Sequence, residues 1–180
     1  MSKVIVISTS LRAKSNSEIL TEKMVQGAKD AGHDVEVISL KGKNIGFCKG
    51  CLACIRTQKC VLGDDAVEIT EKVKNADTVV FSTPIYYYGM SGQMKTLLDR
   101  MNPLFTSDYN FRNIYLLSTA AEDADYVPEK AVSGLQGWVD CYSKAAFAGS
   151  LFCGGVNGAG EAAGKRDKEN EAYEFGKNLK

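Results

Sequence analysis

The chain has 180 residues, of which 44% are hydrophobic and 24% charged, the composition of a globular protein with one hydrophobic core. Its 22 Lys and Arg residues balance its 22 Asp and Glu residues, so the formal net charge is zero. This balance excludes the basic surface of a nucleic-acid-binding protein, so we expect no nucleic-acid partner. No apolar run approaches the roughly 18 residues of a membrane span, so we expect no contact with a membrane.

Apolar runs that suit buried strands alternate with segments of helical periodicity along the chain. The first predicted strand covers residues 3–8 and a polar loop covers residues 9–17. A helix that Gly32 ends then leads to a second strand at residues 35–40. A cysteine-rich insertion at residues 46–62 interrupts the pattern. The pattern continues with a helix capped by Asp64 and Asp65, a strand at residues 78–82 and a loop at 83–89. A helix around 94–101 and a strand at 114–118 follow. The last elements are a helix around 132–142, a strand at 145–152 and a final helix over 161–179.

Five alternations of strand and helix predict a single α/β domain over residues 1–180, with helices on both faces of a five-stranded parallel sheet. Such a three-layer sandwich fits the flavodoxin-like strand order 2-1-3-4-5, which places FMN at the switch point beside the first strand. The glycine-rich stretch at residues 154–164 has two open interpretations, a mobile loop or a contact with a partner.

The polar loop after the first predicted strand offers several groups that bind phosphate. It contains the hydroxyls of Ser10, Ser15 and Ser17, the amide of Asn16 and the guanidinium of Arg12, just before a helix N-terminus. Backbone N–H groups and the helix dipole favour an anion there, and Arg12 adds a charge-assisted contact. The G-x-G-x-x-G fingerprint of a dinucleotide site is absent. The alternative is a polar loop in which Ser15 or Asn16 only caps the helix.

The loop after the third predicted strand lies at the carboxyl edge of the sheet, where ligands of open α/β folds bind. Pro84 fixes its turn, and three consecutive tyrosines offer flat, amphipathic surface suited to an aromatic ring such as isoalloxazine. Backbone N–H groups in this loop suit the N and O atoms of a flavin. The alternative is that the tyrosines pack over the next helix or at a subunit interface. The candidate residues for the ring are Pro84, Ile85, Tyr86, Tyr87, Tyr88 and Gly89.

Four of the six cysteines lie in the insertion with the spacing C-x2-C-x2-C-x5-C, as Cys48, Cys51, Cys54 and Cys60. The N-terminal apolar run is too short for a signal peptide, so we expect a cytoplasmic protein whose cysteines are thiols or metal ligands. Four closely spaced thiolates are what one iron–sulfur cluster needs, and they also suit a structural zinc ion. The third alternative is a set of free thiols. The other two cysteines, Cys141 and Cys153, are expected to be buried small side chains.

Together the two loops resemble those of the NADPH-dependent FMN reductase family of flavodoxin-like proteins. The first loop is similar to the family's Ser-x-Arg-x-x-Ser-Asn-Ser/Thr, matched by Ser10, Arg12, Ser15, Asn16 and Ser17. The second is similar to Ser/Thr-Pro-x-Tyr-x-x-Gly-x-x-Ser-Gly-x-Lys, matched by Thr83, Pro84, Tyr86 and Gly92. The resemblance covers residues 3–100. It implies FMN phosphate on the first loop and the flavin ring on the second.

The same resemblance implies a third flavin-contacting loop after the fourth predicted strand, near Ser118–Ala121, with Ser118 and Thr119 as its candidate residues. The cysteine segment in turn resembles that of the iron–sulfur flavoproteins, a branch of the same superfamily with the same cysteine spacing. This second resemblance implies a 4Fe–4S cluster that passes electrons to FMN. It also implies a homodimer or homotetramer in which a cluster lies near a neighbouring subunit's flavin.

We therefore expect an FMN-dependent oxidoreductase in which the cofactor carries the chemistry and no side chain is a catalytic residue. We expect FMN to receive electrons from NAD(P)H or from a reduced ferredoxin-like carrier and to pass them to a small acceptor. The alternative function is a flavodoxin-like electron carrier without a small-molecule substrate. The neutral charge favours the enzyme, because dedicated carriers use charge to steer docking.

Overall fold

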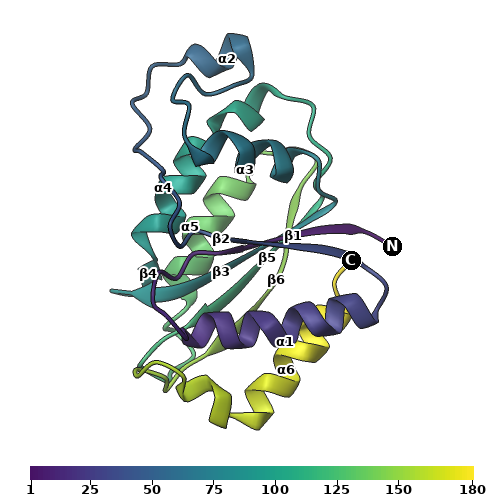
Figure 1. Cartoon of the computed structure of the whole chain (residues 1–180), viewed down its shortest axis with the longest axis vertical. Coiled ribbons are helices and arrows are strands. Elements are labelled where there is room, and N and C mark those ends of the chain that lie inside the picture. The colour runs from purple at the N-terminus through teal and green to yellow at the C-terminus, as the bar shows by residue number, and fades with distance from the viewer.

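A parallel sheet forms the middle layer of the structure, a computed structural model that describes residues 1–180 (Figure 1). Its strands are β1 (Lys3–Ser8), β2 (Asp34–Ser39), β3 (Thr78–Tyr86), β4 (Gly89–Met90), β5 (Asn113–Thr119) and β6 (Ala146–Cys153). Five of them are parallel, in the order β2-β1-β3-β5-β6, and β4 pairs antiparallel with the end of β3. The predicted flavodoxin-like order is therefore confirmed, with β4 as one additional hairpin strand.

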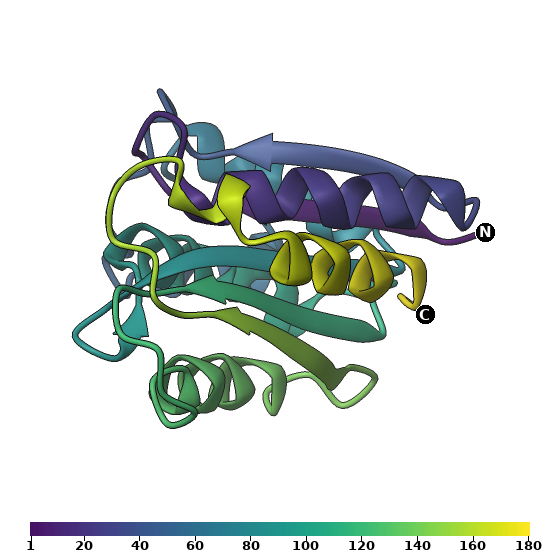
Figure 2. The same ribbon diagram turned by 90° about the horizontal axis from the view of Figure 1, so that it is seen from below.

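Helices cover both faces of this sheet. One face carries α1 (Asn16–Asp30) and α6 (Arg166–Lys177), which lie side by side (Figure 2). The other face carries α3 (Asp65–Lys74), α4 (Gly92–Arg100) and α5 (Glu129–Val139). The short elements are α2 (Ala53–Thr57) and the 3₁₀ helices η1 (Asn102–Thr106) and η2 (Glu161–Gly164). None of these helices combines the length and the apolar character needed to cross a membrane.

The alternation of side chains along the strands divides the core into two layers. Ile5 and Ile7 of β1 belong to a cluster of 23 buried residues beneath α3, α4 and α5. Val4 and Val6 belong to a second cluster of 13 buried residues beneath α1 and α6. All four side chains are fully buried, which explains why this strand is a continuous apolar run in the sequence.

The contact between α1 and α6 depends on two glycines. A Cβ atom on Gly27 would overlap the carbonyl oxygen of Tyr173, and one on Gly176 would overlap the carbonyl oxygen of Met24. The two helix backbones therefore touch at these points. This close approach brings the C-terminal helix against the helix that follows the first loop.

Three features differ from the prediction. β3 continues through part of the predicted loop as far as Tyr86, because residues 85 and 86 pair with β4. The predicted helix over residues 161–179 is two elements, η2 and α6, because Lys165 leaves helical geometry with φ −95° and ψ 74°. Cys153 is buried as expected, but Cys141 is exposed because α5 ends at Val139 and Cys141 lies in the turn that follows.

Gly176→Ala tests the close contact of α1 with α6. The added methyl group forces the two backbones apart, so we expect the free energy of unfolding to fall by about 2–3 kcal/mol. Urea denaturation followed by circular dichroism measures the change.

Gly137→Ala in α5 is the matched control, because a Cβ atom there meets no other atom within 4 Å. Removal of a helical glycine with nothing to clash is expected to raise stability by up to about 1 kcal/mol. If Gly176→Ala proves as harmless as Gly137→Ala, the two helices do not touch as described.

Candidate functional site

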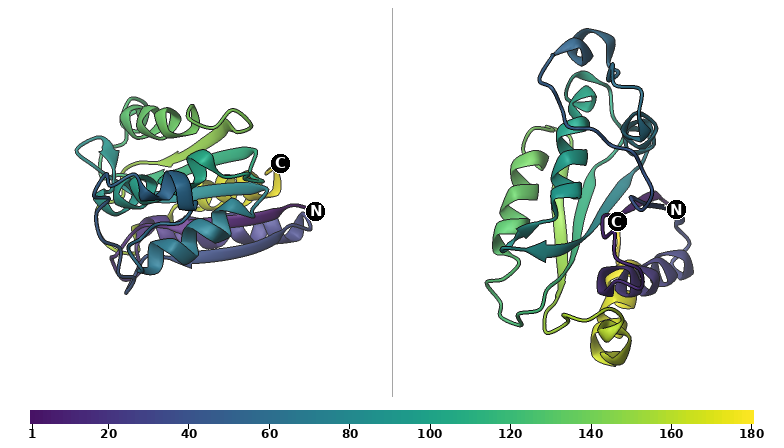
Figure 3. Two further views of the ribbon diagram at one scale, coloured as in Figure 1. Left: turned by 90° about the horizontal axis from the view of Figure 1, so that it is seen from above. Right: turned by 60° about the vertical axis from the view of Figure 1, so that its left-hand side comes forward.

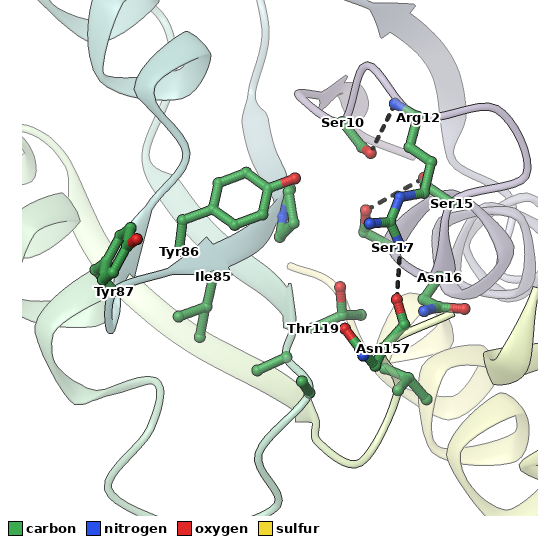
Figure 4. A pocket seen from close by; sticks show the side chains of 14 residues that line it. Ser10, Arg12, Ser15, Asn16, Ser17, Ile85, Tyr86, Tyr87, Thr119 and Asn157 are labelled. Atoms are coloured by element: carbon green, nitrogen blue, oxygen red, sulfur yellow. Dashed lines mark hydrogen bonds between the residues drawn. The ribbon is translucent and has the colours of Figure 1, made fainter. Parts of the chain in front are cut away.

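The carboxyl ends of β1, β3 and β5 lie close together and carry three loops that surround a cavity of about 350 Å³ (Figure 4). The chain leaves β1 for a helix on one face of the sheet and β3 for a helix on the other, so the cavity lies at the switch point where open α/β folds bind ligands. The lining residues are Ser10, Arg12, Ser15, Asn16, Ser17, Pro84, Ile85, Tyr86, Tyr87, Thr119, Ala120, Ala121, Val156 and Asn157.

The first loop presents buried polar groups at the start of α1. Ser10, Ser15, Asn16 and Ser17 are each at most 5% exposed. Of the two residues considered for the helix cap, Ser15 takes this role, since its hydroxyl accepts a hydrogen bond from the Glu18 N–H at 3.2 Å. Other N–H groups of a first helical turn have no partner within the helix, so this end of α1 favours a bound anion.

The glycine-rich segment 154–164 packs against the first loop. The Arg12 guanidinium donates a hydrogen bond to the carbonyl of Asn157 at 2.7 Å (Figure 4). Asn16 donates to the carbonyl of Gly158 at 2.8 Å and accepts from the N–H of Ala162 at 3.0 Å. Arg12 and Asn157 are 145 positions apart in the chain, so no local sequence pattern marks this wall of the cavity.

The second loop is the hairpin between β3 and β4, and its turn is strained. Its two central residues, Tyr87 and Tyr88, have φ values of 50° and 64°, in the left-handed region that disfavours large side chains. Hairpin turns with two such residues favour Asn and Gly. Tyr87 is 99% exposed, so contacts within this chain do not offset its strain. Strained backbone of this kind clusters at functional sites.

Tyr88 is held by the loop that follows β5. Its hydroxyl donates a hydrogen bond to Glu122 at 3.0 Å, and the Lys130 ammonium lies 5.5 Å from the centre of its ring. The Tyr126 hydroxyl donates to the same carboxylate, whose hydrogen bond and charge raise the pKa of Tyr126 to about 12. Glu122 thus ties the second loop to the third across one side of the cavity.

Most residues predicted for the flavin line this cavity, and three do not. Tyr88 is engaged with Glu122, and Gly89 lies in β4. Ser118 is buried within β5, and its hydroxyl has no hydrogen-bond partner. Ala120 and Ala121 in the lining belong to the predicted third loop, whereas Val156 and Asn157 were not predicted as site residues. Val156 carries no chemistry that a sequence pattern reveals, and Asn157 joins the site only through the tertiary contact with Arg12.

The cysteine segment, residues 46–62, projects beyond the sheet at one end of the molecule and includes α2 (Figure 3). Its four cysteines line one cavity of about 190 Å³ together with Arg100 and Asn102. Cys54 is buried and Cys60 half-buried, whereas Cys48 and Cys51 are exposed. No three His, Cys, Asp or Glu side chains are gathered closely enough to hold a metal ion. The four cysteines therefore share one cavity without the close approach of a formed metal site, and four thiols are the donor set that a thiolate-bound cluster needs.

A buried ion pair anchors this segment to the core. The Arg100 side chain is fully buried, and its guanidinium donates to both carboxylate oxygens of Asp64, at 2.6 and 2.8 Å. Burial opposes ionisation of Asp64, but hydrogen bonds from Arg100 and the Gly46 N–H outweigh it and hold the carboxyl pKa below its usual value. Arg100 also donates to the carbonyls of Gly46 and Leu62. Both ends of the segment therefore meet at one guanidinium.

Comparison with known proteins points to one family. The profile of the NADPH-dependent FMN reductase family matches residues 2–129. The chain is similar to an iron–sulfur flavoprotein of Methanocaldococcus jannaschii, with 39% identity over 102 residues that cover 57% of this chain and 53% of that protein. It thus spans about half the length of that relative.

Two further proteins resemble the chain over more of their length. An iron–sulfur flavoprotein of Methanosarcina thermophila is 25% identical over 155 residues, which cover 86% of this chain and 81% of that protein. The structure of an NAD(P)H:quinone oxidoreductase from Methanothermobacter marburgensis superposes with a TM-score of 0.81 at 20% identity, over 99% of this chain and 96% of that one. At this identity the structural likeness shows the shared fold.

Tyr87→Asn tests the strain in the hairpin turn. Asn tolerates left-handed backbone better than Tyr, and the exposed ring buries nothing, so we expect the free energy of unfolding of the ligand-free protein to rise by about 1 kcal/mol. Thermal unfolding of the ligand-free protein measures the change.

Leu11→Asn is the control for that substitution. Leu11 is a half-exposed apolar residue of the first loop without positive φ, so its replacement is expected to leave stability nearly unchanged. A loss of stability in Tyr87→Asn would mean that the tyrosine makes a contact that outweighs its strain.

Proposed function

The chain belongs to the NADPH-dependent FMN reductase family, and on that premise we propose that it passes electrons from NAD(P)H or a ferredoxin-like carrier, through FMN, to a small acceptor. The family match carries this proposal. The buried polar loop at the start of α1 supports it, because that loop suits a phosphate monoester.

In this proposal the first loop holds the phosphate of FMN. Ser10, Ser15, Asn16 and Ser17 place hydroxyl and amide groups around the N-terminus of α1, where a dianion is favoured. Arg12 supplies the positive charge. Its contact with the Asn157 carbonyl keeps the guanidinium at the rim of the cavity.

The flavin ring is assigned to the other two loops. Pro84, Ile85 and Tyr86 form one side of the cavity, and Thr119 with the alanines that follow forms another. Tyr86 extends from the end of β3 across the cavity (Figure 4). The contact of Tyr88 with Glu122 positions this turn, so Tyr88 and Gly89 act on the ring through the hairpin backbone.

The proposal gives no side chain the role of a catalytic acid or base. The lining contains no carboxylate, imidazole or thiol. When bound, FMN accepts a hydride or single electrons and supplies the redox chemistry. The loops bind the cofactor, orient its ring and leave one side open to the donor and the acceptor.

We further propose that the four cysteines hold a 4Fe–4S cluster as a second redox centre. Their spacing, their common cavity and the similarity to proteins named iron–sulfur flavoproteins support this assignment. Because Cys48 and Cys51 are exposed, the segment is open to assembly of a cluster from solvent. A zinc ion or four free thiols are the competing outcomes, and iron analysis separates them.

We also propose that the chain forms a homodimer or homotetramer. Leu11, Phe47, Leu52 and Tyr87 each expose more than half of their side chains around the flavin cavity and the cysteine segment. Apolar side chains exposed in this number suit contact with a second copy of the chain.

An electron carrier without a small-molecule substrate is the second candidate. The exposed cysteine cavity favours it, because exchange with a protein partner needs a redox centre near the surface. The zero net charge favours the reductase. Steady-state oxidation of NAD(P)H with a quinone acceptor supports the reductase, and its absence with every acceptor supports the carrier.

Arg12→Gln tests the phosphate assignment. Loss of the guanidinium removes one charge-assisted contact, so we expect the dissociation constant of FMN to rise by roughly tenfold or more while that of riboflavin, which lacks the phosphate, stays unchanged. Fluorescence titration of the ligand-free protein measures both constants.

Lys14→Gln removes an equal charge from the same loop and serves as the control, since Lys14 does not line the cavity. Lys14→Gln is expected to raise the dissociation constant of FMN by much less than Arg12→Gln does. Equal losses of FMN and riboflavin affinity in Arg12→Gln would place the phosphate elsewhere.

Cys51→Ser tests the cluster assignment. Anaerobically purified protein is expected to show flavin absorbance and roughly four irons with matching sulfide per chain, and Cys51→Ser is expected to lose most of the iron but keep the flavin. Visible spectra and chemical iron and sulfide analysis give both values.

Cys141→Ser is the matched control, because Cys141 is also exposed but lies outside the cysteine cavity. It is expected to keep both cofactors. Bound flavin without iron in the unsubstituted protein would contradict the cluster assignment and leave a simple FMN reductase. Zinc in place of iron would identify the four cysteines as a structural zinc site.

A further inference from the structure

Two side chains outside the cysteine segment donate hydrogen bonds to its sulfur atoms. Asn102 donates from Nδ2 to Cys54 Sγ at 3.0 Å, and Arg100 donates from a guanidinium nitrogen to Cys60 Sγ at 3.4 Å. Asn102 begins η1 and Arg100 ends α4, so one short stretch of chain supplies both donors. Cys48 and Cys51, the exposed pair, receive no side-chain hydrogen bond.

We propose that Asn102, together with Arg100, raises the reduction potential of the cysteine-bound cluster by hydrogen bonds to two of its four sulfur ligands. This inference rests on the proposed function, because it requires the cluster. Neither residue is a cluster ligand. Both act through the sulfurs that they contact and are therefore positioning residues.

The physical basis is the charge that the cluster gains. One-electron reduction adds a negative charge that spreads over the sulfur ligands, and an N–H dipole aimed at a sulfur stabilises this reduced form more than the oxidised form. Removal of such a donor therefore lowers the potential. The effect is larger where solvent is excluded, and Cys54 is the buried member of the set.

The two donors differ in how firmly they are fixed. Arg100 is fully buried and is held by Asp64 and by the carbonyls of Gly46 and Leu62, so it cannot swing away from Cys60. Asp64 also balances its charge, which leaves the guanidinium acting chiefly as a hydrogen-bond donor. Asn102 is neutral and only partly buried, and its amide contacts the sulfur directly.

Asn102 is therefore the residue to change. Substitution of Arg100 would leave Asp64 without its partner and release both ends of the cysteine segment, so a changed potential would have more than one cause. Asn102→Leu keeps the size of the side chain and removes only the donor. Gln58→Met is the matched control, because it removes an amide of the same segment that donates to the Thr106 carbonyl and not to a sulfur.

The experiment is an anaerobic redox titration of the purified holoprotein, in which electron paramagnetic resonance reports the reduced cluster and visible absorbance reports the flavin. In Asn102→Leu we expect a roughly tenfold shift of the equilibrium toward the oxidised cluster, which is about 59 mV for a one-electron couple. Iron content and flavin potential are expected to stay unchanged. Gln58→Met is expected to match the unsubstituted protein.

The outcomes separate this inference from the proposed function. Absence of a cluster from the unsubstituted protein overturns the inference and the cluster assignment but leaves the proposed FMN reductase. A cluster with the same potential in Asn102→Leu and in the unsubstituted protein overturns the inference alone, as does an equal shift in Gln58→Met. If the Asn102→Leu variant loses iron, Asn102→Ser is measured in its place. The serine hydroxyl is too short to reach Cys54, so the same fall in the reduction potential of the cluster is expected. An unchanged potential in Asn102→Ser then overturns the inference.

Discussion

The parallel pairing of β1 with β3 is the constraint on which both candidate sites depend. Val4 lies beside Thr78 in the sheet, although the helix and strand that follow β1 and the whole cysteine segment separate them in the chain. Parallel strands end at the same edge, so the first loop and the tyrosine hairpin meet there, and the segment after β2 starts there. A groove of about 480 Å³ lined by Phe47 and Tyr86 joins the two regions. The meeting of the first loop, the tyrosine hairpin and the start of the cysteine segment at one edge thus follows from strand order.

The parts of the fold that depend on local pattern were predictable from the sequence. The continuous apolar run at β1 is buried on both faces, and the polar loop after it does carry the helix cap at Ser15. The wall formed by Asn157 was not predictable, because it arises only when Gly27 and Gly176 bring α6 against α1 and the preceding segment reaches Arg12. Long-range contacts of this kind leave no periodic signal.

The tyrosine hairpin and the cysteine segment show a different limit. Three consecutive tyrosines suggest an aromatic surface, but not that Tyr87 and Tyr88 occupy left-handed backbone or that Glu122 holds Tyr88 away from the cavity. The cysteine spacing suggests a cluster, but not that Asn102 donates to Cys54. In each case the motif marks the chemistry, and neighbours distant in the sequence determine how each side chain is used.

Anaerobic titration of the FMN-loaded protein with NADPH, followed by visible absorbance, tests the central claim most directly. A flavin held at the carboxyl edge of the sheet and open to a hydride donor is expected to lose its absorbance near 450 nm as about one NADPH per FMN is consumed, and to regain it when a quinone is added. A purified protein that takes up no FMN, or whose bound FMN is reduced neither by NADPH or NADH nor by a reduced ferredoxin, would contradict the account.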